Sequence, residues 1–272
     1  MNAAFFYQTV SGRFLLRLLQ GAHLFSLAAG FLRTPFSCVL IPWYIRKHQI
    51  DMRPFVLRHY HSFVDFFARA KDECLFEEAP GVLISPCDGL LTVYPITRNL
   101  RIHMKGSWYR LRDLISNRET ADSFRGGYCF VFRLQAKDYH HFCCIDDGTL
   151  LSTIFLPGQL HSVQPIACDT VPVYRLNRRW WSVLDTAHFG RVVQIEVGAM
   201  LVGGVHLCKV QGECQRGEEL GHFELAGSTI VLLVTESVRK QLHMYEPYVA
   251  SLGGYAEVPV TMGQGIGVLR DA

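Results

Sequence analysis

The spacing of hydrophobic and polar positions changes near residue 80. Before that point, apolar groups such as Phe14-Leu15-Leu16 and Leu24-Phe25 are separated by arginines, a pattern typical of short amphipathic helices. After it, short runs rich in β-branched and aromatic residues alternate with turn residues. The pattern predicts a helical region over residues 1–80 and a β-rich core over residues 81–272. The expected fold class is α+β, with amino-terminal apolar and basic helices followed by a mostly antiparallel β core, as a sandwich or an open barrel.

Nine runs in the second region have the length and composition of β-strands. They are Val82–Ile84, Leu90–Tyr94, Tyr128–Leu134, Leu151–Leu156, Val171–Tyr174, Trp180–Leu184, Val192–Val197, Val205–Val210 and Thr229–Val234. One helical segment, at about Leu111–Ser116, interrupts them. No internal repeat or low-complexity linker marks a second domain.

A helix start is predicted just before the change of pattern. Ser62-Phe63-Val64-Asp65 has the form of a capping box, with Ser62 as the N-cap and Asp65 in the position usually held by glutamate. We expect a short helix that continues to about Lys71. The acidic stretch Asp72–Glu78 and Pro80 would end it.

The amino-terminal sixty residues are basic, with Asp51 as their one acid. The longest stretches without charged residues, Leu18–Leu32 and Thr34–Ile45, are shorter than the roughly 20 residues of a membrane-spanning helix. Apolar helices flanked by arginine suit the membrane surface, where cations meet anionic lipid. We therefore expect a peripheral protein on the cytoplasmic face of the cell membrane. Helices that cap a soluble core, or a spanning helical hairpin, are the alternatives.

Composition narrows the choice of partners. Hydrophobic residues make up 49% of the chain and charged residues only 19%, which leaves apolar surface to be covered. A formal net charge of +3 gives no support to nucleic-acid binding. The nine cysteines include no CxxC pair, and no cleavable leader is visible. Reduced thiols in the cytoplasm are therefore expected, and cysteine spacing does not predict a zinc site.

The segment Gly227-Ser228-Thr229, followed by the apolar run Ile230–Val234, is a candidate for chemistry. Glycine allows backbone conformations that other residues avoid, so the Ser228 hydroxyl could approach the carbonyl of Gly227. Self-cleavage is then conceivable. The alternative is an ordinary turn, because Gly-Ser-Thr is a common tripeptide.

Four further stretches precede this segment in a fixed order. They are Ser85-Pro86-Cys87-Asp88-Gly89, Asp138-Tyr139-His140-His141-Phe142, Pro157-Gly158-Gln159-Leu160-His161-Ser162-Val163 and Val197-Gly198-Ala199-Met200-Leu201-Val202-Gly203. Together with Gly227-Ser228-Thr229 they resemble the phosphatidylserine decarboxylase family, whose proenzymes cut themselves at such a serine. The resemblance also takes in Tyr7–Arg17 and Ser62–Phe67, so it covers nearly the whole chain. Five motifs in one order are far more specific than any one of them.

The resemblance implies a self-processing enzyme. The Ser228 hydroxyl would attack the Gly227 carbonyl, and the resulting ester would break to give a β chain of residues 1–227 and an α chain of residues 228–272. Ser228 would become a pyruvoyl group, whose ketone serves as the electron sink for decarboxylation. The reaction would convert phosphatidylserine to phosphatidylethanolamine in phospholipid biosynthesis, without a metal or an added cofactor. The two cleaved chains are expected to stay together, and a homodimer is possible.

The resemblance also assigns the catalytic roles. Asp88 would orient the imidazole of His140, and His140 would accept the proton of Ser228 and later supply an acid for decarboxylation. For Asp88 the alternative is an Asx-turn, because it lies between turn residues. For any histidine the alternative is a hydrogen-bonded structural imidazole.

Four more residues are candidates for substrate binding. They are Tyr139, His141, His161 and Gly198. His141 is a weaker catalytic candidate than His140, because adjacent residues of an extended strand face opposite ways. Gly198 could let the backbone approach the lipid headgroup, or it could mark a β-bulge.

The chain departs from the usual family motif at Cys143. The common form, Asp-Tyr-His-Arg-Phe-His, has a second histidine where this sequence has Cys143, and an arginine where it has His141. His140 is therefore expected to serve both self-cleavage and decarboxylation. The departure also favours an alternative function, that of a catalytically silent relative that acts as a lipid-binding or scaffold protein.

Overall fold

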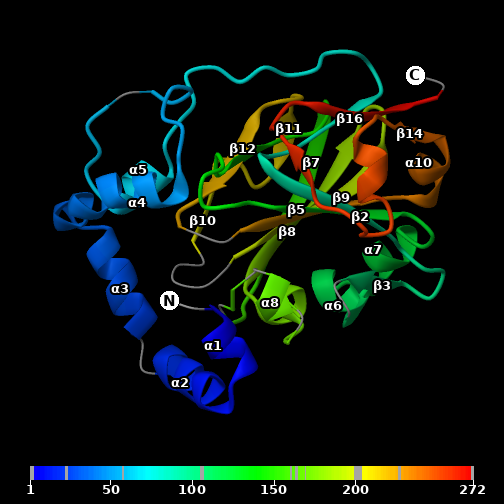
Figure 1. Cartoon of the computed structure of the whole chain (residues 1–272). Coiled ribbons are helices and arrows are strands. Elements are labelled where there is room, and N and C mark those ends of the chain that lie inside the picture. Colours follow the sequence, from blue (N-terminus) through cyan, green and yellow to red (C-terminus); the bar gives the residue numbers. More distant parts are fainter. Residues whose placement is uncertain are drawn as a thin grey trace.

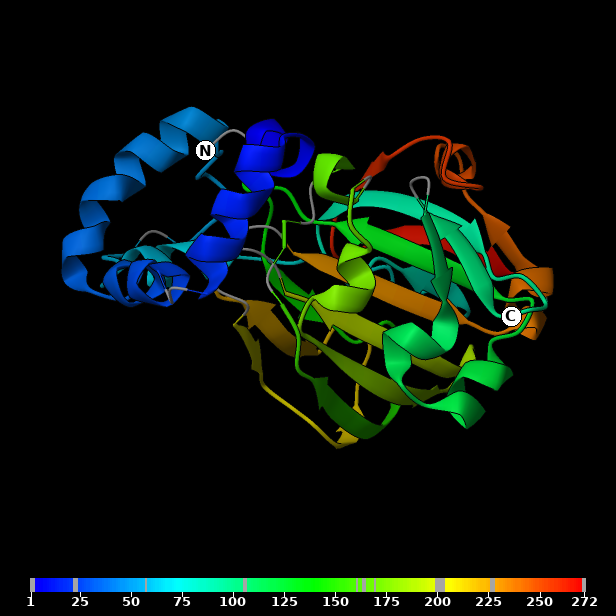
Figure 2. The same ribbon diagram turned by 90° about the horizontal axis from the view of Figure 1, so that it is seen from below.

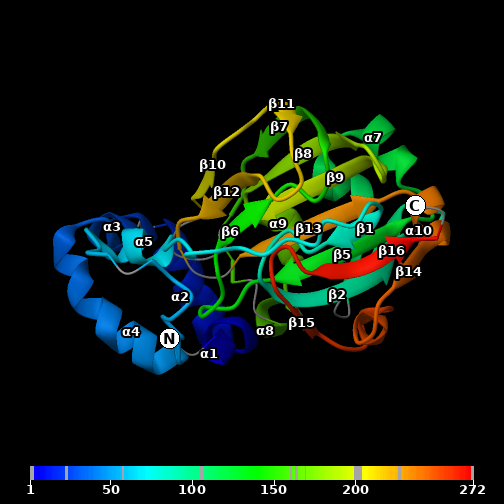
Figure 3. The same ribbon diagram turned by 90° about the horizontal axis from the view of Figure 1, so that it is seen from above.

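The structure is a computed structural model of the chain. It describes residues 3–21, 24–56, 58–104, 107–159, 161–162, 165–168, 170–198, 204–225 and 228–270. The amino-terminal helices gather on one side of a β-rich core, where several strands cross the molecule (Figures 1 and 3). The α+β class and its mostly antiparallel sheets are as predicted.

An eight-stranded antiparallel sheet forms the centre of the core. Its strands, in spatial order, are β11 (Gly212–Cys214), β7 (Gly148–Leu156), β8 (Arg179–Thr186), β9 (Gly190–Val197), β13 (Thr229–Val234), β5 (Tyr128–Arg133), β2 (Gly89–Pro95) and β15 (Val258–Val260). Figure 3 shows β13 between β9 and β5. All six residues of β13 are buried, which explains its continuous apolar sequence.

Smaller sheets complete the β structure. They are β1 (Val82–Ile84) with β16 (Gly265–Leu269) and β14 (Leu242–Met244), β10 (Val205–Leu207) with β12 (Glu219–Phe223) and β6 (His141–Cys143), and β3 (Arg101–Met104) with β4 (Ser107–Arg110). Alternate residues of β13 enter two hydrophobic cores. Ile230 and Leu232 share one core with residues of β1, β6 and β12, and Val231 and Leu233 lie in the other. The central sheet is therefore covered on both faces, as in a sandwich.

The helices are short. They are α1 (Ala3–Gln8), α2 (Val10–Gly21), α3 (Leu24–Leu32), η1 (Pro35–Leu40), α4 (Ile41–His48), α5 (Phe63–Phe67), α6 (Leu111–Ile115), α7 (Arg118–Ser123), α8 (Pro165–Cys168), α9 (Val173–Leu176), α10 (Glu236–Gln241) and η2 (Tyr248–Ser251). Helix α1 lies near α8, and Phe6 and Tyr7 of α1 contribute to the second core (Figure 2). Phe66 and Phe67 of α5 belong to the first core together with Leu83 of β1.

The N-cap at Ser62 is formed as predicted, but the Asp65 carboxylate bonds the amide of the residue before the N-cap, and the helix is shorter than predicted. Ser62 Oγ accepts a hydrogen bond from the Asp65 amide at 3.1 Å, and Asp65 accepts one from the amide of His61 at 2.8 Å. The predicted end near Lys71 is wrong, because α5 ends at Phe67. The following residues bond to an earlier segment instead, with Ala70 accepting from the amide of Val56 at 3.0 Å.

Two of the nine predicted strands differ in the structure. The predicted strand Val171–Tyr174 is wrong, because helix α9 occupies Val173–Leu176. Pro172 precedes this helix with a φ of −75°, and its carbonyl accepts a hydrogen bond from the Leu176 amide at 3.1 Å. Strand β10 ends at Leu207 rather than at Val210. The other seven runs are strands, with ends within a few residues of those predicted.

Apolar surface is concentrated in the amino-terminal region. Of the eighteen large hydrophobic side chains exposed in the described part, ten lie within the first 56 residues. They are Phe5, Val10, Phe14, Leu15, Leu27, Phe31, Phe36, Val39, Trp43 and Val56. Within the described ranges, none of the helices combines the length and apolar character that crossing a membrane requires.

Candidate active site at one end of the central sheet

Two predicted catalytic residues lie at the same end of the central sheet. Strands β2 and β13 both pair antiparallel with β5, so they run in the same direction and begin at the same edge. Asp88 directly precedes β2, and Ser228 directly precedes β13. Since one strand separates them, their chain positions are roughly 10 Å apart, two strand spacings.

Ser228 is fixed and shielded from solvent. It is 1% exposed, and its carbonyl accepts a hydrogen bond from the amide of Leu134 at 3.0 Å. Strand alternation places its side chain on the face of Ile230, which belongs to the first core. Gly227, the predicted partner in cleavage, lies outside the described residues.

His140 is a neutral, buried imidazole. It is fully buried, its ring centre lies 4.2 Å from that of Phe67, and burial lowers its pKa to about 3, with the guanidinium of Arg69 acting in the same direction. Nδ1 lies 2.9 Å from the carbonyl of Asp138, so it must carry the proton and donate. Nε2 then presents a lone pair, and it is buried without a hydrogen-bond partner in the part of the chain that the structure describes.

Backbone contacts bring His140 and Ser228 into one region. The carbonyl of His140 accepts from the amide of Phe223 at 2.9 Å, five residues before Ser228. On the other side, Leu134 bonds Ser228 and begins the loop that leads to His140. Hydrogen bonds therefore join the segment that leads to His140 and the segment that leads to Ser228 at both of their ends. Within the described residues, no hydrogen bond joins the side chains of His140 and Ser228.

Asp88 faces a cavity rather than His140. Its carboxylate accepts from Lys71 Nζ at 2.8 and 2.9 Å and from the Met262 amide at 2.9 Å, and the Tyr139 amide lies 3.4 Å away. These contacts come from distant segments, so they are not those of an Asx-turn. The predicted contact between Asp88 and His140 is not formed. Lys71, Asp88 and Tyr139 line a cavity of about 910 Å³, together with Lys137.

Tyr139 and His141 are stacked on each other. Their ring centres are 4.5 Å apart with an angle of 9° between the planes. Tyr139 lines the cavity. His141 instead faces the three-stranded sheet of β10, β12 and β6, called the outer sheet below, and contacts Glu219 Oε1 through Nδ1 at 2.9 Å. The adjacent histidines thus separate as strand geometry predicts, His140 into the core and His141 away from it.

His161 and Gly198 are connected through a buried asparagine. The Asn177 side chain accepts from the His161 amide at 2.8 Å and donates to the Gly198 carbonyl at 2.7 Å. Because Val197 pairs with Thr229, this places Gly198 beside the start of β13. Burial lowers the pKa of His161. These two candidates therefore lie at the same edge of the sheet as Ser228.

Sequence reasoning missed three residues of this region. Lys71 neutralises Asp88, Asn177 joins two candidates, and Glu196 of β9 is a buried acid whose pKa burial raises to about 7. A single acid inside the apolar run Val192–Val197 was the available signal for Glu196. Neither Lys71 nor Asn177 has a comparable signal, because their partners are distant in sequence.

Comparisons with known proteins show which family the chain resembles. The family model described as phosphatidylserine decarboxylase matches residues 60–268. Phosphatidylserine decarboxylase proenzyme 2 of Clostridium acetobutylicum is 39% identical over 272 residues, covering 98% of this chain and 91% of the relative. The phosphatidylserine decarboxylase proenzyme of Clostridium kluyveri is 34% identical over 96% of this chain and 90% of its own length. That of Clostridium novyi is 35% identical over 83% and 79%.

Proposed function

The chain belongs to the phosphatidylserine decarboxylase family, and from this premise we propose that it removes carbon dioxide from phosphatidylserine to yield phosphatidylethanolamine. The prosthetic group is a pyruvoyl group made from Ser228. The single observation that carries the proposal is the neutral His140, whose buried Nε2 has no hydrogen-bond partner among the described residues and whose backbone bonds to Phe223, five residues before Ser228. The family assignment favours this enzyme over a silent scaffold protein.

Self-cleavage uses the chain's own groups. The Ser228 hydroxyl attacks the carbonyl carbon of Gly227, and His140 Nε2 accepts the hydroxyl proton. The C–N bond of the amide breaks as the C–O bond of an ester forms. Elimination then releases residues 1–227 with a carboxyl end, and hydrolysis with loss of ammonia leaves the new first residue of the 228–272 chain as the pyruvoyl group.

The surroundings of Ser228 fit such a group. The Leu134 amide holds the carbonyl of Ser228, which would become the amide carbonyl next to the ketone. The site is shielded from water, with Ser228 only 1% exposed. The α chain would remain bound after cleavage, because β13 pairs with β5 on one side and β9 on the other.

The pyruvoyl group supplies a ketone that condenses with the substrate amine and withdraws electrons as carbon dioxide leaves. The remaining tasks belong to side chains. His140 holds the proton that replaces the lost carboxyl group. The cavity bounded by Asp88, Tyr139 and Lys137 receives the headgroup, and the lysine offers a cation for its phosphate. His161 and Gly198 border the opposite side of Ser228.

The amino-terminal helices hold the enzyme on the membrane. Their nine exposed large apolar side chains include Phe36 and Val39, which are 81% and 76% exposed, and Arg46 and Lys47 lie on the neighbouring helix α4. Such a surface buries apolar groups at the headgroup boundary while its cations meet anionic lipid. The protein would thus be peripheral, on the cytoplasmic face. A homodimer is a separate prediction, to be tested by sedimentation.

The decisive experiment measures the intact masses of untagged wild-type protein and of Ser228→Ala, alongside release of phosphatidylethanolamine from phosphatidylserine vesicles. Wild type should give two polypeptides, 1–227 and 228–272, with the smaller one blocked at its amino terminus, and it should be active. Ser228→Ala should give one inactive chain. Ser237→Ala, at an exposed position of helix α10 beyond the other end of β13, should behave as wild type. An unbroken wild-type chain with an ordinary serine would refute the proposal.

A further inference from the structure

Three histidines form a row across the outer sheet. His206 of β10 pairs with His222 of β12, and His222 pairs with His141 of β6. Their ring centres are 4.9 Å apart in the first pair and 4.8 Å in the second. Cross-strand neighbours on one face of a sheet are close enough to share a ligand.

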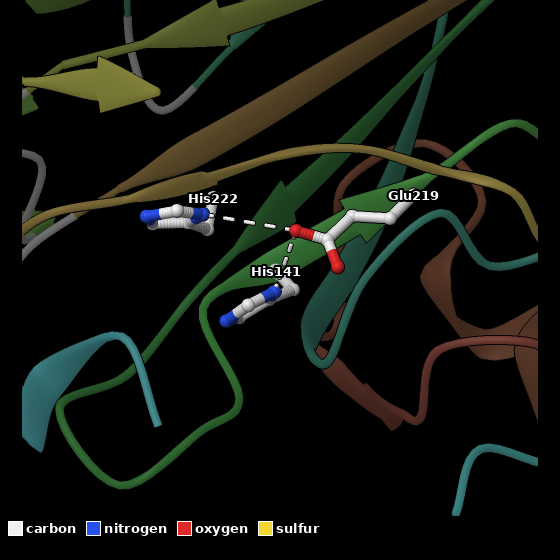
Figure 4. Close-up of side chains that lie close together, drawn as sticks. All are labelled: His141, Glu219 and His222. Atoms are coloured by element: carbon white, nitrogen blue, oxygen red, sulfur yellow. Dashed lines mark hydrogen bonds and ion pairs between the residues drawn. The ribbon is translucent and has the colours of Figure 1, made fainter. Parts of the chain in front are cut away.

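Two of these imidazoles converge on one carboxylate. His141 Nδ1 lies 2.9 Å from Glu219 Oε1, and His222 Nδ1 lies 3.7 Å from the same oxygen. The three atoms all lie within 4.8 Å of one another, and Figure 4 shows both rings directed at that oxygen. Ligand atoms around a tetrahedral zinc ion, with bonds of about 2.0–2.2 Å, lie roughly 3.3–3.6 Å apart, so small side-chain movements suffice.

The contacts of His141 require either a second ring proton or a metal ion between the imidazole and the carboxylate. Nε2 lies 3.1 Å from the carbonyl of Ala68, an acceptor, so this nitrogen must carry a proton. In the neutral ring Nδ1 then has a lone pair, and it faces the carboxylate of Glu219. Two acceptors do not approach to 2.9 Å unless a second proton or a metal ion lies between them. A ring N–H bonded to a backbone carbonyl is also the usual outer contact of a metal-binding histidine.

His222 and Cys208 also lie close to the carboxylate of Glu219. His222 Nδ1 is buried and has no hydrogen-bond partner among the described residues. The thiol of Cys208 lies 3.6 Å from Glu219 Oε1. Thus two imidazole nitrogens and a carboxylate oxygen lie within 4.8 Å of one another, and a thiol lies beside that oxygen.

We propose that His141, Glu219 and His222 form a binding site for a divalent transition-metal ion of the zinc class, with Cys208 available as a fourth ligand. Imidazole, carboxylate and thiolate are the ligand types that zinc accepts in tetrahedral sites. Hard cations such as Mg²⁺ and Ca²⁺ prefer oxygen ligands, and this cluster has one carboxylate.

The bound ion would clamp β6 to β12. Strand β6 begins directly after His140, so the clamp would fix the segment that carries the proposed base. All the ligands precede Ser228 and lie on one side of the proposed cut. The inference therefore does not depend on cleavage, and an uncut Ser228→Ala chain tests it equally well.

The experiment titrates Zn²⁺ into the untagged, metal-stripped full chain by calorimetry, with zinc content after dialysis as a second measure. Wild type and Ser228→Ala should each bind one equivalent. His222→Gln should weaken binding by at least about tenfold, the low end of what altered metal-site residues cost. The control is His243→Gln on β14, an exposed histidine away from the cluster, which should leave binding unchanged.

Cobalt provides a readout of the ligands themselves. Co²⁺ bound by wild type should give the visible absorption of a tetrahedral site, with a thiolate charge-transfer band that Cys208→Ser removes. Correctly folded His222→Gln, checked by circular dichroism, should lack the tetrahedral spectrum. Equal Zn²⁺ affinity in His222→Gln and His243→Gln would overturn the site. So would the absence of binding by folded wild type at about 100 μM Zn²⁺. Either result would mean that a proton lies between His141 and Glu219.

Discussion

His140 and His141 are neighbours in sequence but lie in contrasting regions. His140 is fully buried against Phe67, is neutral, and has one ring nitrogen without a hydrogen-bond partner among the described residues. His141 lies in the outer sheet, where both ring nitrogens have partners, Ala68 and Glu219. In the first region the charged neighbour of the imidazole is the guanidinium of Arg69, and in the second it is the carboxylate of Glu219, which contacts the ring directly.

The difference shows how a strand divides chemistry between its two faces. A lone pair held in an apolar region is available to accept a proton from a hydroxyl, although its low pKa keeps the imidazolium scarce until the reaction supplies the proton. An imidazole beside a carboxylate is occupied by a proton or a metal ion instead. The two regions should therefore respond differently to substitution.

The largest expected effect is that of His140→Ala on self-cleavage. Loss of the base should slow the cut by at least about 100-fold, the low end of the contribution of general bases. The appearance of the 228–272 chain, followed by intact mass after synthesis, measures this rate. His141→Gln is the matched variant, and it should retain a rate within about tenfold of wild type. Equal rates for His140→Ala and wild type would remove His140 from the mechanism.

The pKa of Glu196 reports how well water is excluded from the edge of the central sheet that holds Ser228. Its side chain is fully buried, and burial raises its pKa to about 7 from 4.5. The folded state therefore retains a proton that the unfolded state releases, so wild type loses stability as pH rises from 4.5 to 7. This contribution is at most about 3 kcal/mol. Glu196→Gln lacks this loss, and its stability relative to wild type should increase from pH 4.5 to pH 8.

Urea unfolding in the uncut Ser228→Ala background measures that difference with one chain. Glu213→Gln, at an exposed position of β11, serves as the control. If the stability difference between Glu196→Gln and its parent is the same at both pH values, then Glu196 titrates as an ordinary glutamate and the edge is wetter than the structure indicates.

Asp88 accepts a hydrogen bond from the amide of Tyr139, the residue before His140. Asp88→Asn should have a smaller effect than loss of His140. Because its carboxylate contacts Lys71 and not His140, we expect the cut to slow by about tenfold, or 1.4 kcal/mol in the barrier. Asp51→Asn is the control, since Asp51 lines the same cavity but pairs with Arg53 at the surface. A loss as large as that of His140→Ala would mean that Asp88 contacts the imidazole during cleavage.

The sequence predicted the regular parts of this molecule better than the contacts between them. Thr229–Val234 is a strand with the predicted ends, because a continuous apolar run buried on both faces has few other solutions. Strands β6 and β12 were missed because they are short and rich in histidine and glutamate. Their pairing is what assembles the outer cluster.

The candidate site was predictable only as a set of residues. Motif order identified Asp88, His140 and Ser228, but it gave no hint that Lys71 would take the carboxylate of Asp88. Cysteine spacing likewise could not reveal a metal site whose main ligands are two histidines and a glutamate on paired strands. The first contact joins two segments outside the strands, and the second depends on the register of β6 and β12, which local patterns do not specify.

The smallest expected effect is that of Cys143→His, which restores the usual family residue. Cys143 is fully buried, and its amide donates to the Pro86 carbonyl at 2.9 Å, beside the turn that carries Asp88. A new imidazole would have to compete with Lys71 for a carboxylate that is already satisfied, and it would overfill a packed core. We expect the cut rate to change by less than about fivefold, under 1 kcal/mol in the barrier, with some loss of stability.

Cys143→Ser controls for the loss of the thiol. The double variant Asp88→Asn/Cys143→His tests whether any increase in the cut rate depends on the Asp88 carboxylate. A tenfold faster cut in Cys143→His that disappears in the double variant would show that the imidazole acts through Asp88. In that case the two regions would not be separate in function. The contact of Asp88 with Lys71 would then be a substitute for a histidine that this chain has lost, and His140 would carry only part of the self-cleavage reaction.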